Sequence, residues 1–199
     1  MKRVLVNIRG TNGSGKSTIP LSMYEDPKAY IIQKPYKGKK RKIATVFPSK
    51  GWIALGSYLN KTGGMDTFPN NELTQKALWY VLKKYPEYDV LMEGIIASTI
   101  RSTYIDLFQK VQDSGMAKVL VINFLPPVEV SLERVQLRNG GKPVKEDAIE
   151  AKRRTVEKCH KAFKEAGFVS VRVDTSKYSK EEMLPMFLRI VKKYKAQEG

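Results

Sequence analysis

The stretch GTNGSGKST, residues 10–18, has the residue types and the spacing of a phosphate-binding loop. It matches the pattern G-x-x-x-x-G-K-[ST] in full, between a short apolar run and a helical pattern. Its glycines allow backbone N–H groups to point at phosphate oxygens, and its lysine neutralises the β- and γ-phosphates. The hydroxyl of Ser17 is a suitable Mg²⁺ ligand. We therefore expect ATP and Mg²⁺ to be held by Gly10, Asn12, Gly13, Ser14, Gly15, Lys16, Ser17 and Thr18.

Two carboxylates are candidates for the chemistry at such a loop. Glu93 ends the apolar run 89–92, and the carboxyl ends of parallel strands meet at the edge where phosphates bind. Asp66 closes a segment without any other acid, and the surrounding cations favour its ionised form. Either group is able to accept a proton from an acceptor hydroxyl, and Glu93 is also a candidate for holding Mg²⁺ through water. The sequence leaves the choice of base open, and plain turn or strand-end roles remain as alternatives.

A second set of cations has the pattern of a lid over the nucleotide. Arg134 and Arg138 are four residues apart, so they share one helix face ahead of a Gly-Gly turn. We expect a lid over residues 134–154, in which both arginines bind ATP and Arg138 stabilises the migrating phosphoryl group. A solvated basic helix is the alternative. Asp174 follows the last strand, at a place where a resemblance to P-loop kinases implies contact with the adenine; capping a turn is the alternative. The next helix adds Lys152, Arg153 and Arg154.

Residues 27–65 contain no Asp or Glu but nine Lys or Arg, interleaved with aromatic residues. They carry nine of the 16 net positive charges of the chain. Such a one-sided surface suits a nucleic-acid backbone, where released counterions supply affinity. A solvated charged face is the alternative. The residues expected to bind DNA are Lys37, Lys39, Lys40, Arg41, Lys42 and Lys50.

The composition excludes several other classes of protein. The chain has 199 residues, 42% of them apolar, which is enough for a core and excludes wholesale disorder. One cysteine, Cys159, excludes an internal disulfide framework, and one histidine, His160, excludes a multi-histidine metal centre. The N-terminus is not typical of a signal peptide, and no apolar run reaches the length of a membrane span. We expect a cytoplasmic protein without a membrane partner.

The elements that must position these residues alternate between strand-like and helix-like patterns, which is typical of a parallel sheet with crossover helices. They predict one domain over residues 1–199, with a three-layer P-loop fold, a parallel five-stranded sheet, a helical lid and a basic β-hairpin insertion at about 33–69. The predicted hairpin pairs residues 43–47 with 52–55. The predicted sheet strands are 4–8, 29–32, 89–92, 118–124 and 169–173, and the predicted helices are 16–24, 71–85, 99–113, 128–138, 146–166 and 179–194.

The chain resembles the P-loop superfamily of nucleoside and nucleotide kinases. No D-x-x-G or N-K-x-D motif stands where a switch GTPase needs it. Within the superfamily it is similar to bacteriophage 5-hydroxymethyluracil DNA kinases, on the stretch GSYLNKTGGMD at residues 56–66, on Glu93-Gly94 and on the basic insertion. The resemblance implies ATP with Mg²⁺, and phosphorylation of the 5-hydroxymethyl group in double-stranded phage DNA within the host cytoplasm, ahead of further hypermodification.

One departure from the wider superfamily affects the site. Glu93 is followed by glycine rather than by the arginine of an acid–arginine pair, which leaves the base assignment in doubt. Two other functions remain possible at this point: a kinase of free nucleosides or nucleoside monophosphates, and a P-loop ATPase stimulated by nucleic acid. A monomer and a homodimer are both compatible with the sequence.

Overall fold

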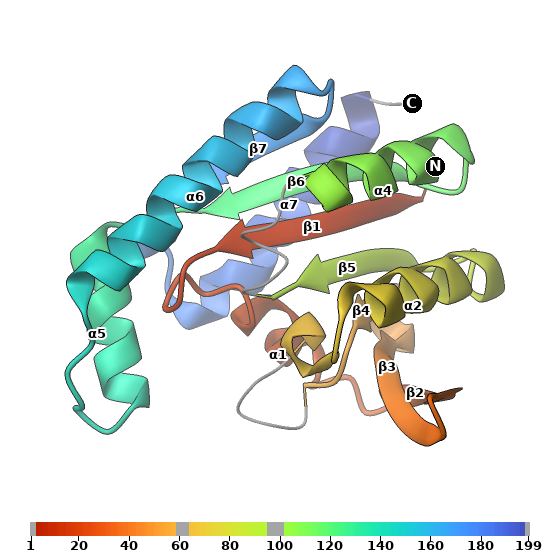
Figure 1. Ribbon diagram of the computed structural model, residues 1–199, viewed down its shortest axis with the longest axis horizontal. Coiled ribbons are helices and arrows are strands. Elements are labelled where there is room, and N and C mark those ends of the chain that lie inside the picture. Colours follow the sequence, from red (N-terminus) through yellow and green to blue (C-terminus); the bar gives the residue numbers. More distant parts are fainter. Residues whose placement is uncertain (1–2, 59–63, 95–101, 198–199) are drawn as a thin grey trace.

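The computed structural model describes residues 3–58, 64–94 and 102–197. They form one seven-stranded sheet in the order β2-β3-β4-β5-β1-β6-β7 (Figure 1). Five adjacent strands are parallel, so their carboxyl ends form one edge. These strands are β4 (Trp52–Leu55), β5 (Asp89–Glu93), β1 (Val4–Gly10), β6 (Lys118–Phe124) and β7 (Val169–Val173).

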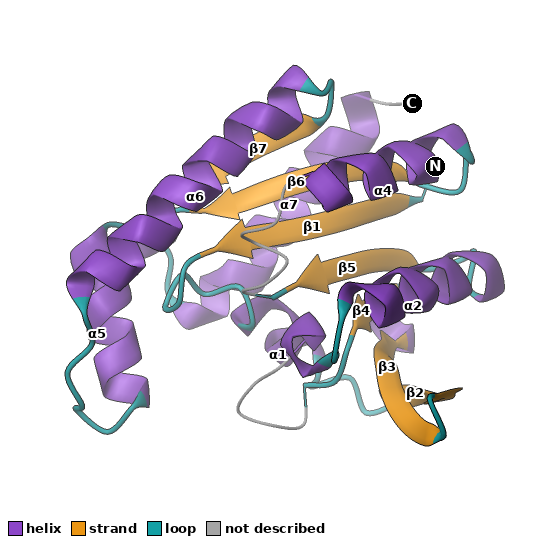
Figure 2. Cartoon of the chain, viewed as in Figure 1, coloured by secondary structure: helices purple, strands orange, loops and turns teal. Residues whose placement is uncertain are grey.

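Helices cover both faces of the sheet, which gives the three layers that the alternating pattern predicts (Figure 2). Leu5 of β1 packs in one core cluster, whereas its neighbours Val4 and Val6 pack in the other. No helix in the described ranges has an apolar stretch long enough to cross a membrane. One face carries α2 (Asn71–Lys84), α4 (Ser102–Asp113) and α6 (Glu146–Glu165), and the other carries α1 (Thr18–Met23) and α7 (Lys180–Gln197).

The remaining helix, α5 (Val128–Arg138), occupies the residues predicted for it and precedes the turn into α6. α1 begins two residues later than predicted, at Thr18, and α7 extends further, to Gln197. The predicted start of the helix at residues 99–101 lies outside the described residues. The helix periodicity in the sequence was therefore a sound guide to most element boundaries.

Two strands take different places from those predicted. The predicted hairpin exists, because β3 (Lys39–Phe47) pairs antiparallel with β4 across the short turn η1 (Pro48–Lys50). However, β4 also pairs in parallel with β5, so it is the fifth core strand. The prediction that residues 29–32 supply that strand was wrong: they belong mostly to β2 (Tyr30–Tyr36), an antiparallel edge partner of β3. Apolar content is similar in both segments, and only the chain path decides which one joins the parallel set.

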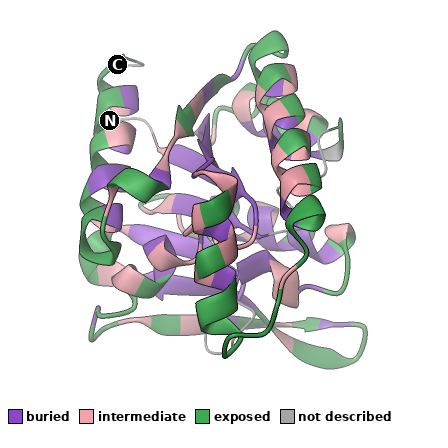
Figure 3. Ribbon diagram, turned by 90° about the vertical axis from the view of Figure 1, so that its left-hand side faces the viewer, coloured by how far each residue is buried: buried purple, intermediate pink, exposed green. Residues whose placement is uncertain are grey.

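The basic residues 37–42 form the turn and the first part of the second strand in another hairpin. β2 and β3 are joined by Lys37 and Gly38, both with positive φ (49° and 74°), as a two-residue hairpin turn requires. In this hairpin Lys34 lies opposite Arg41, and Tyr36 lies opposite Lys39. Figure 3 shows the hairpin along the lower edge of the molecule, with many exposed residues.

Candidate active site

The predicted phosphate-binding loop lies directly after β1, at the carboxyl edge of the sheet. Gly13 and Gly15 have φ angles of 76° and 87°, which L side chains rarely adopt. The Lys16 ammonium is buried and donates to the carbonyl oxygens of Gly10 and Thr11 at 3.0 and 2.8 Å. Asn12 has a buried side-chain oxygen without a hydrogen-bond partner in the described part of the chain. The loop therefore presents an ammonium and an amide to a ligand at this edge.

Glu93 lies beside the loop and is almost completely buried at the end of β5. The Ser17 hydroxyl donates to its two carboxylate oxygens at 3.3 and 3.4 Å, and Tyr58 forms a further side-chain hydrogen bond with it. Burial raises the pKa of Glu93, and the charge of Asp66 adds to this, whereas Lys16 opposes it. Gly64 is needed here, because a Cβ at this position would lie 2.5 Å from a Glu93 carboxylate oxygen.

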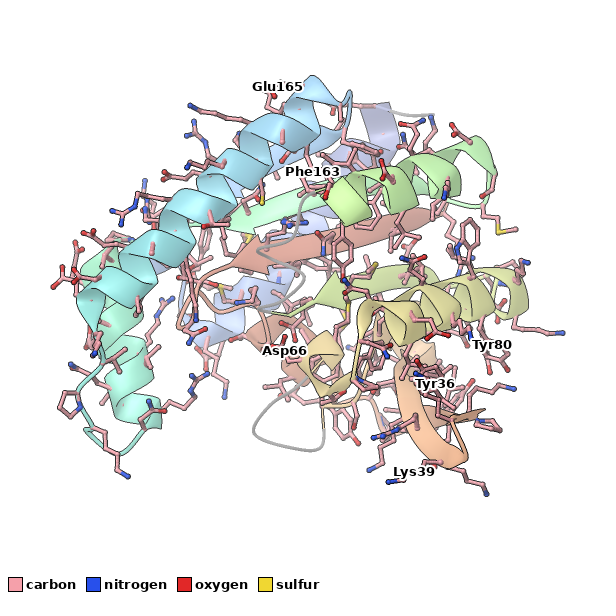
Figure 4. The ribbon with its side chains drawn as sticks, in the orientation of Figure 1. Tyr36, Lys39, Asp66, Tyr80, Phe163 and Glu165 are labelled. Carbon is pink, nitrogen blue, oxygen red and sulfur yellow. The ribbon has the colours of Figure 1, made fainter. Side chains whose placement is uncertain are left out.

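Asp66 reaches the same place from the short turn η2 (Gly64–Thr67). Its carboxylate oxygen Oδ1 lies 3.0 Å from the position that a Cβ on Gly94 would take, so Gly94 permits this approach. Asp66 is half-buried, whereas Glu93 is closed off from solvent. The structure thus brings together both carboxylates that the sequence offered as competing bases. The label in Figure 4 marks Asp66 below the ends of the parallel strands.

Tyr58 is a site residue that the sequence reasoning missed. It is buried, and burial together with the nearby Glu93 raises the pKa of its hydroxyl well above the ordinary value, so it stays protonated. It follows Gly56 and Ser57 in the stretch of residues 56–66 that carries the resemblance to the phage kinases. Nothing in that stretch marks the tyrosine as a partner of a carboxylate 35 positions later.

The residues around Lys16 fit a magnesium ion. Hydroxyl and carboxylate oxygens are the hard donors that Mg²⁺ prefers, and Ser17 and Glu93 offer both within one hydrogen-bonded pair. The described residues contain no cluster of three or more acidic, histidine or cysteine side chains suited to a metal. This donor set suits an ion that takes its other ligands from phosphates and water.

Arg134 ties the phosphate-binding loop to the segment after β7. Its guanidinium donates to the Gly13 carbonyl at 3.4 Å and to the backbone and side-chain oxygens of Thr175 at 3.1 and 3.3 Å. Thr175 is fully buried, and its hydroxyl donates to the Ser14 carbonyl at 2.9 Å. Thr175 was missed, although it is the neighbour of the predicted Asp174. Asp174 itself accepts from the backbone and hydroxyl of Ser176, which is the turn-capping alternative.

The lid cations fall into two groups. Arg138 is exposed at the end of α5, yet its charge reaches Lys16 and lowers the pKa of that ammonium, after the larger effect of burial. Arg153 donates to the Pro126 carbonyl and pairs with Glu157. Arg154 pairs with Glu150 at 3.0 Å on the outer surface of α6. The latter two arginines are therefore engaged in holding α6.

Lys152 is the α6 cation that faces the site. The buried stripe of α6 runs through Ile149, Val156, Cys159 and Phe163, and residue 152 falls between the first two with the same spacing. Cys159 lies beside Arg9, the residue before the loop, and α6 runs antiparallel to β1. Seven residues correspond to about 10 Å, which carries Lys152 past the strand end toward the loop. Accordingly, its charge also lowers the pKa of Lys16, with a larger effect than Arg138.

The predicted DNA-binding residues do not lie over the phosphate-binding loop. The hairpin β2–β3 stands beside α2, to which it is fixed by the Tyr36 hydroxyl, which donates to Glu72 at 2.9 Å and accepts from the Asn70 amide nitrogen at 3.0 Å. Figure 4 marks Lys39 at the lower right, away from Asp66. Four of the six predicted residues are exposed on this hairpin and Arg41 is half-buried there. Lys50 lies at the far end of β3, in η1, and is not brought together with them.

Residues 2–184 match the family model described as "5-hmdU DNA kinase". The chain is 45% identical over 194 residues to the 5-hmdU DNA kinase of Bacillus phage SP10, covering 95% of this chain and 30% of that protein. It is 38% identical over 149 residues to 5-hmdU DNA kinase 1 of Salmonella phage ViI, covering 73% of this chain and 64% of that protein.

A solved structure supports the fold. The YorR protein of Bacillus subtilis, determined in complex with phosphorylated GDP, superposes with a TM-score of 0.54 at 14% identity, covering 94% of this chain and 95% of that one. The chain spans 30% and 64% of the lengths of the two phage relatives named above, which is less than two thirds of each. By the match of its family model over almost all its residues, the chain belongs to the 5-hmdU DNA kinase family.

Proposed function

We propose that this chain transfers the γ-phosphate of ATP to the hydroxymethyl oxygen of 5-hydroxymethyluracil in DNA. One observation carries the proposal: two carboxylates lie together at the phosphate-binding loop, where Glu93 is hydrogen-bonded to Ser17 and Asp66 lies against Gly94, the residue after Glu93. A donor phosphate on the loop would therefore lie next to a group able to receive the proton of an acceptor alcohol. The names of the phage relatives support the choice of acceptor.

On the donor side, the residues assigned to ATP are those of the loop, together with two lid cations. Lys16, Lys152 and Arg138 would neutralise charge on the phosphoryl group as it moves. Arg134 acts as a positioning residue, because its bonds to Gly13 and Thr175 hold the loop against the segment after β7. We assign the Mg²⁺ ion to Ser17 and Glu93. When bound, it would supply charge neutralisation for the β- and γ-phosphates.

On the acceptor side, we assign the role of general base to Asp66. The carboxylate of Glu93 is already hydrogen-bonded to Ser17 and Tyr58 and is buried beneath η2. Asp66 is half-buried and therefore accessible to a substrate. The acceptor oxygen forms a bond to the γ-phosphorus, the bond from that phosphorus to the β–γ bridging oxygen breaks, and ADP leaves. The hydroxyl proton passes to Asp66.

The hairpin β2–β3 is assigned to the DNA backbone. Its position beside α2 keeps it clear of the phosphate-binding loop, so a duplex held there would approach the site from the side of η2 and α2. Lysines that contact phosphates displace counterions, so binding and activity on DNA should fall steeply as salt rises. Because the relatives are phage proteins, we expect the reaction in the cytoplasm of an infected host.

A transfer assay with γ-labelled ATP tests the proposal directly. The acceptors are duplex DNA with 5-hydroxymethyluracil, the same duplex with thymine, and a panel of free nucleosides and nucleoside monophosphates. We expect label only in the modified duplex, and none with the Lys16→Ala variant. Label in free nucleosides alone would replace the proposal by a nucleoside kinase. ATP hydrolysis without any labelled acceptor would replace it by an ATPase.

The Asp66→Asn variant tests the base. Loss of a general base typically costs about 10²–10⁴ in rate, so kcat on the modified duplex should fall by that factor while ATP affinity is retained. The matched control is Asp106→Asn on α4, an exposed carboxylate that the site does not use. A kcat of Asp66→Asn within a factor of three of the unchanged protein would remove Asp66 from the base role.

A further inference from the structure

The turn between α5 and α6 carries a group of cations at the end of the lid. Residues 134–145 contain four Lys or Arg and no Asp or Glu, namely Arg134, Arg138, Lys142 and Lys145. The last three are exposed, and they form no ion pair with any residue that the structure describes. Polyanions bind to clusters of exposed, unpaired cations of this kind.

ATP accounts for only part of this charge. Arg134 is bonded to Gly13, and Arg138 and Lys152 have larger effects on the pKa of Lys16 than any other cation of the lid. Lys142 and Lys145 lie beyond Arg138, the last residue of α5. These two lysines are therefore free to bind an anion other than the nucleotide.

Backbone hydrogen bonds fix the shape of the turn. The Gly141 N–H donates to the Gln136 carbonyl at 2.9 Å, and the Gly140 N–H donates to the Leu137 carbonyl at 3.3 Å. This pair of bonds is the Schellman motif, which places Gly140 at a φ of 67°. A Cβ on either glycine would meet no atom of the described chain within 4 Å. The turn therefore stands clear of other elements in a defined conformation.

The first half of α5 is anchored to the phosphate-binding loop. The hydroxyls of Ser131 and Thr11 are 3.4 Å apart, and a Cβ on Gly13 would lie 2.4 Å from the Ser131 carbonyl oxygen. Arg134 adds its bond to the Gly13 carbonyl. From Ser131 to Arg138 the helix advances about 10 Å, at about 1.5 Å per residue. The turn is thus held at a fixed distance from the ATP site.

The turn and the hairpin β2–β3 lie at the same end of the molecule. Figure 1 shows both at its lower end, the turn on the left and the hairpin on the right. Figure 4, in the same orientation, marks Asp66 between them and Lys39 on the hairpin. Residues 189–195 of α7 are equally basic, but they lie at the upper end, and Lys195 is paired with Asp89. The turn, and not α7, is placed to act together with the hairpin.

The turn also exposes a large apolar side chain. Leu137, in the last turn of α5, is 75% exposed, whereas Leu21, the next most exposed large apolar residue in the described ranges, is 46% exposed. A single exposed leucine is common on protein surfaces. Next to exposed cations, however, it matches DNA-binding surfaces that insert an apolar side chain into a groove.

We propose that the α5–α6 turn is a second DNA-binding surface, which holds the duplex on the side of Asp66 opposite the hairpin. Lys142 and Lys145 contact phosphates, and Leu137 enters the groove between them. The inference rests on the proposed function and adds a second region of contact for the same DNA. A duplex held on both sides of Asp66 presents the intervening base at a fixed position, as transfer to that base requires.

Replacing Lys142 and Lys145 together by Gln tests the phosphate contacts. The slope of log K against log salt for an unmodified duplex should become shallower by about 1.8, because each lost contact contributes about 0.9. ATP affinity should stay unchanged. The matched control replaces Lys192 and Lys193, two exposed lysines of α7, and should change the slope much less. An unchanged slope, or a loss of ATP affinity with DNA affinity intact, would overturn the proposal.

Leu137→Ser tests the groove contact. An apolar side chain displaces no counterions, so this variant should weaken DNA binding about tenfold at every salt concentration and leave the slope as it is. The control is Leu188→Ser, which removes an exposed leucine of α7. Melting temperatures of both variants show whether each remains folded. Unchanged DNA affinity in folded Leu137→Ser would overturn the groove contact.

A combined variant tests whether one duplex contacts both surfaces. Replacing the two turn lysines together with Lys39, Lys40 and Lys42 of the hairpin should make the slope shallower by about 4.5. The unchanged protein should bind one duplex per chain; two duplexes per chain would overturn the two-sided arrangement. These measurements concern binding alone. Expected slopes without phosphoryl transfer would therefore sink only the proposed function, whereas transfer with unchanged slopes would sink only the role of the turn.

Discussion

Glu93 combines burial with a position beside a second carboxylate, and both conditions disfavour its ionised form. Burial is the larger cause of its raised pKa, and the Asp66 charge adds to it. A carboxyl group with a raised pKa takes up its proton at a higher pH than usual. The protonated form would lose its ability to hold Mg²⁺ with Ser17, so activity should be lost on the acid side first.

The expected pH profile of kcat/KM for ATP with Mg²⁺, which reports groups of the free enzyme, therefore has an acid limb whose midpoint lies above the ordinary Glu value of 4.5. Glu93→Gln should lower kcat and abolish this limb, because the group that titrates is gone. The control is Glu72→Gln on α2, an exposed acid whose pKa is lowered by its bonds to Lys76 and Tyr36. A limb that persists with an unchanged midpoint in Glu93→Gln would assign the titration to another group.

Lys152 differs from its two neighbours on α6 because of the helix face on which it lies. We expect Lys152→Met to lower kcat by about 10²–10³, the usual cost of removing one group that stabilises transition-state charge. Arg154→Met, on the exposed face and paired with Glu150, is the matched control and should stay within twofold. The measurement is kcat on the modified duplex at saturating ATP. Equal effects of the two variants would show that residue 152 acts only as surface charge.

At the scale of elements, the hairpin β2–β3 joins a cationic surface to the start of α2. Tyr36 forms this joint through Asn70, the N-cap of α2, and through Glu72. Lys34 packs over the Tyr80 ring of the same helix at 4.3 Å. The hairpin is thus fixed relative to η2, which directly precedes α2 and carries Asp66. A DNA backbone held by the hairpin would therefore have a defined position relative to Asp66, the proposed general base.

Replacing Lys39, Lys40 and Lys42 together by Gln should weaken DNA binding and flatten its salt dependence. Each lost phosphate contact reduces the slope of log K against log salt by about 0.9, so three contacts would reduce it by about 2.7. ATP affinity should stay unchanged, because the hairpin lies away from the phosphate-binding loop. Lys110→Gln, an exposed lysine in the last turn of α4, controls for net charge. An unchanged slope would remove the hairpin from the DNA surface.

At the scale of the whole molecule, the ATP site is made of segments from most of the chain. The loop after β1, the end of β5, Arg134 on α5 and the turn after β7 are linked by hydrogen bonds across up to 161 positions. A ligand that bridges such distant segments binds the folded state and has no equivalent site in the unfolded chain. Binding should therefore raise the stability of the whole fold.

ATP with Mg²⁺ at 100 times its dissociation constant should stabilise the protein by about 2.7 kcal/mol. For a chain of this size that corresponds to a rise of about 5–10 °C in melting temperature. The Lys16→Ala variant at the same ATP concentration should show a much smaller rise, whereas Lys110→Gln should behave like the unchanged protein. The measurement is thermal unfolding followed by circular dichroism. An equal rise in Lys16→Ala would place the nucleotide elsewhere.

Much of the donor side could be predicted from the sequence, because it depends on local patterns. The spacing of glycines, lysine and serine in residues 10–18 demands one backbone shape, whatever surrounds it. Glu93 was identified because apolar runs predict strands, and acids that end parallel strands share one edge. Helix periodicity likewise predicted α5 and α6 almost to the residue.

Only the tertiary structure decided which distant groups meet. Apolar content could not distinguish residues 29–32 from β4 as the fifth parallel strand, because strand order depends on the path of the chain. Lys152, Tyr58 and Thr175 carry no local signature, since their roles come from the neighbours that packing gives them. Short-range backbone geometry is encoded by neighbouring residues, whereas contacts across a sheet follow from the whole arrangement of its core.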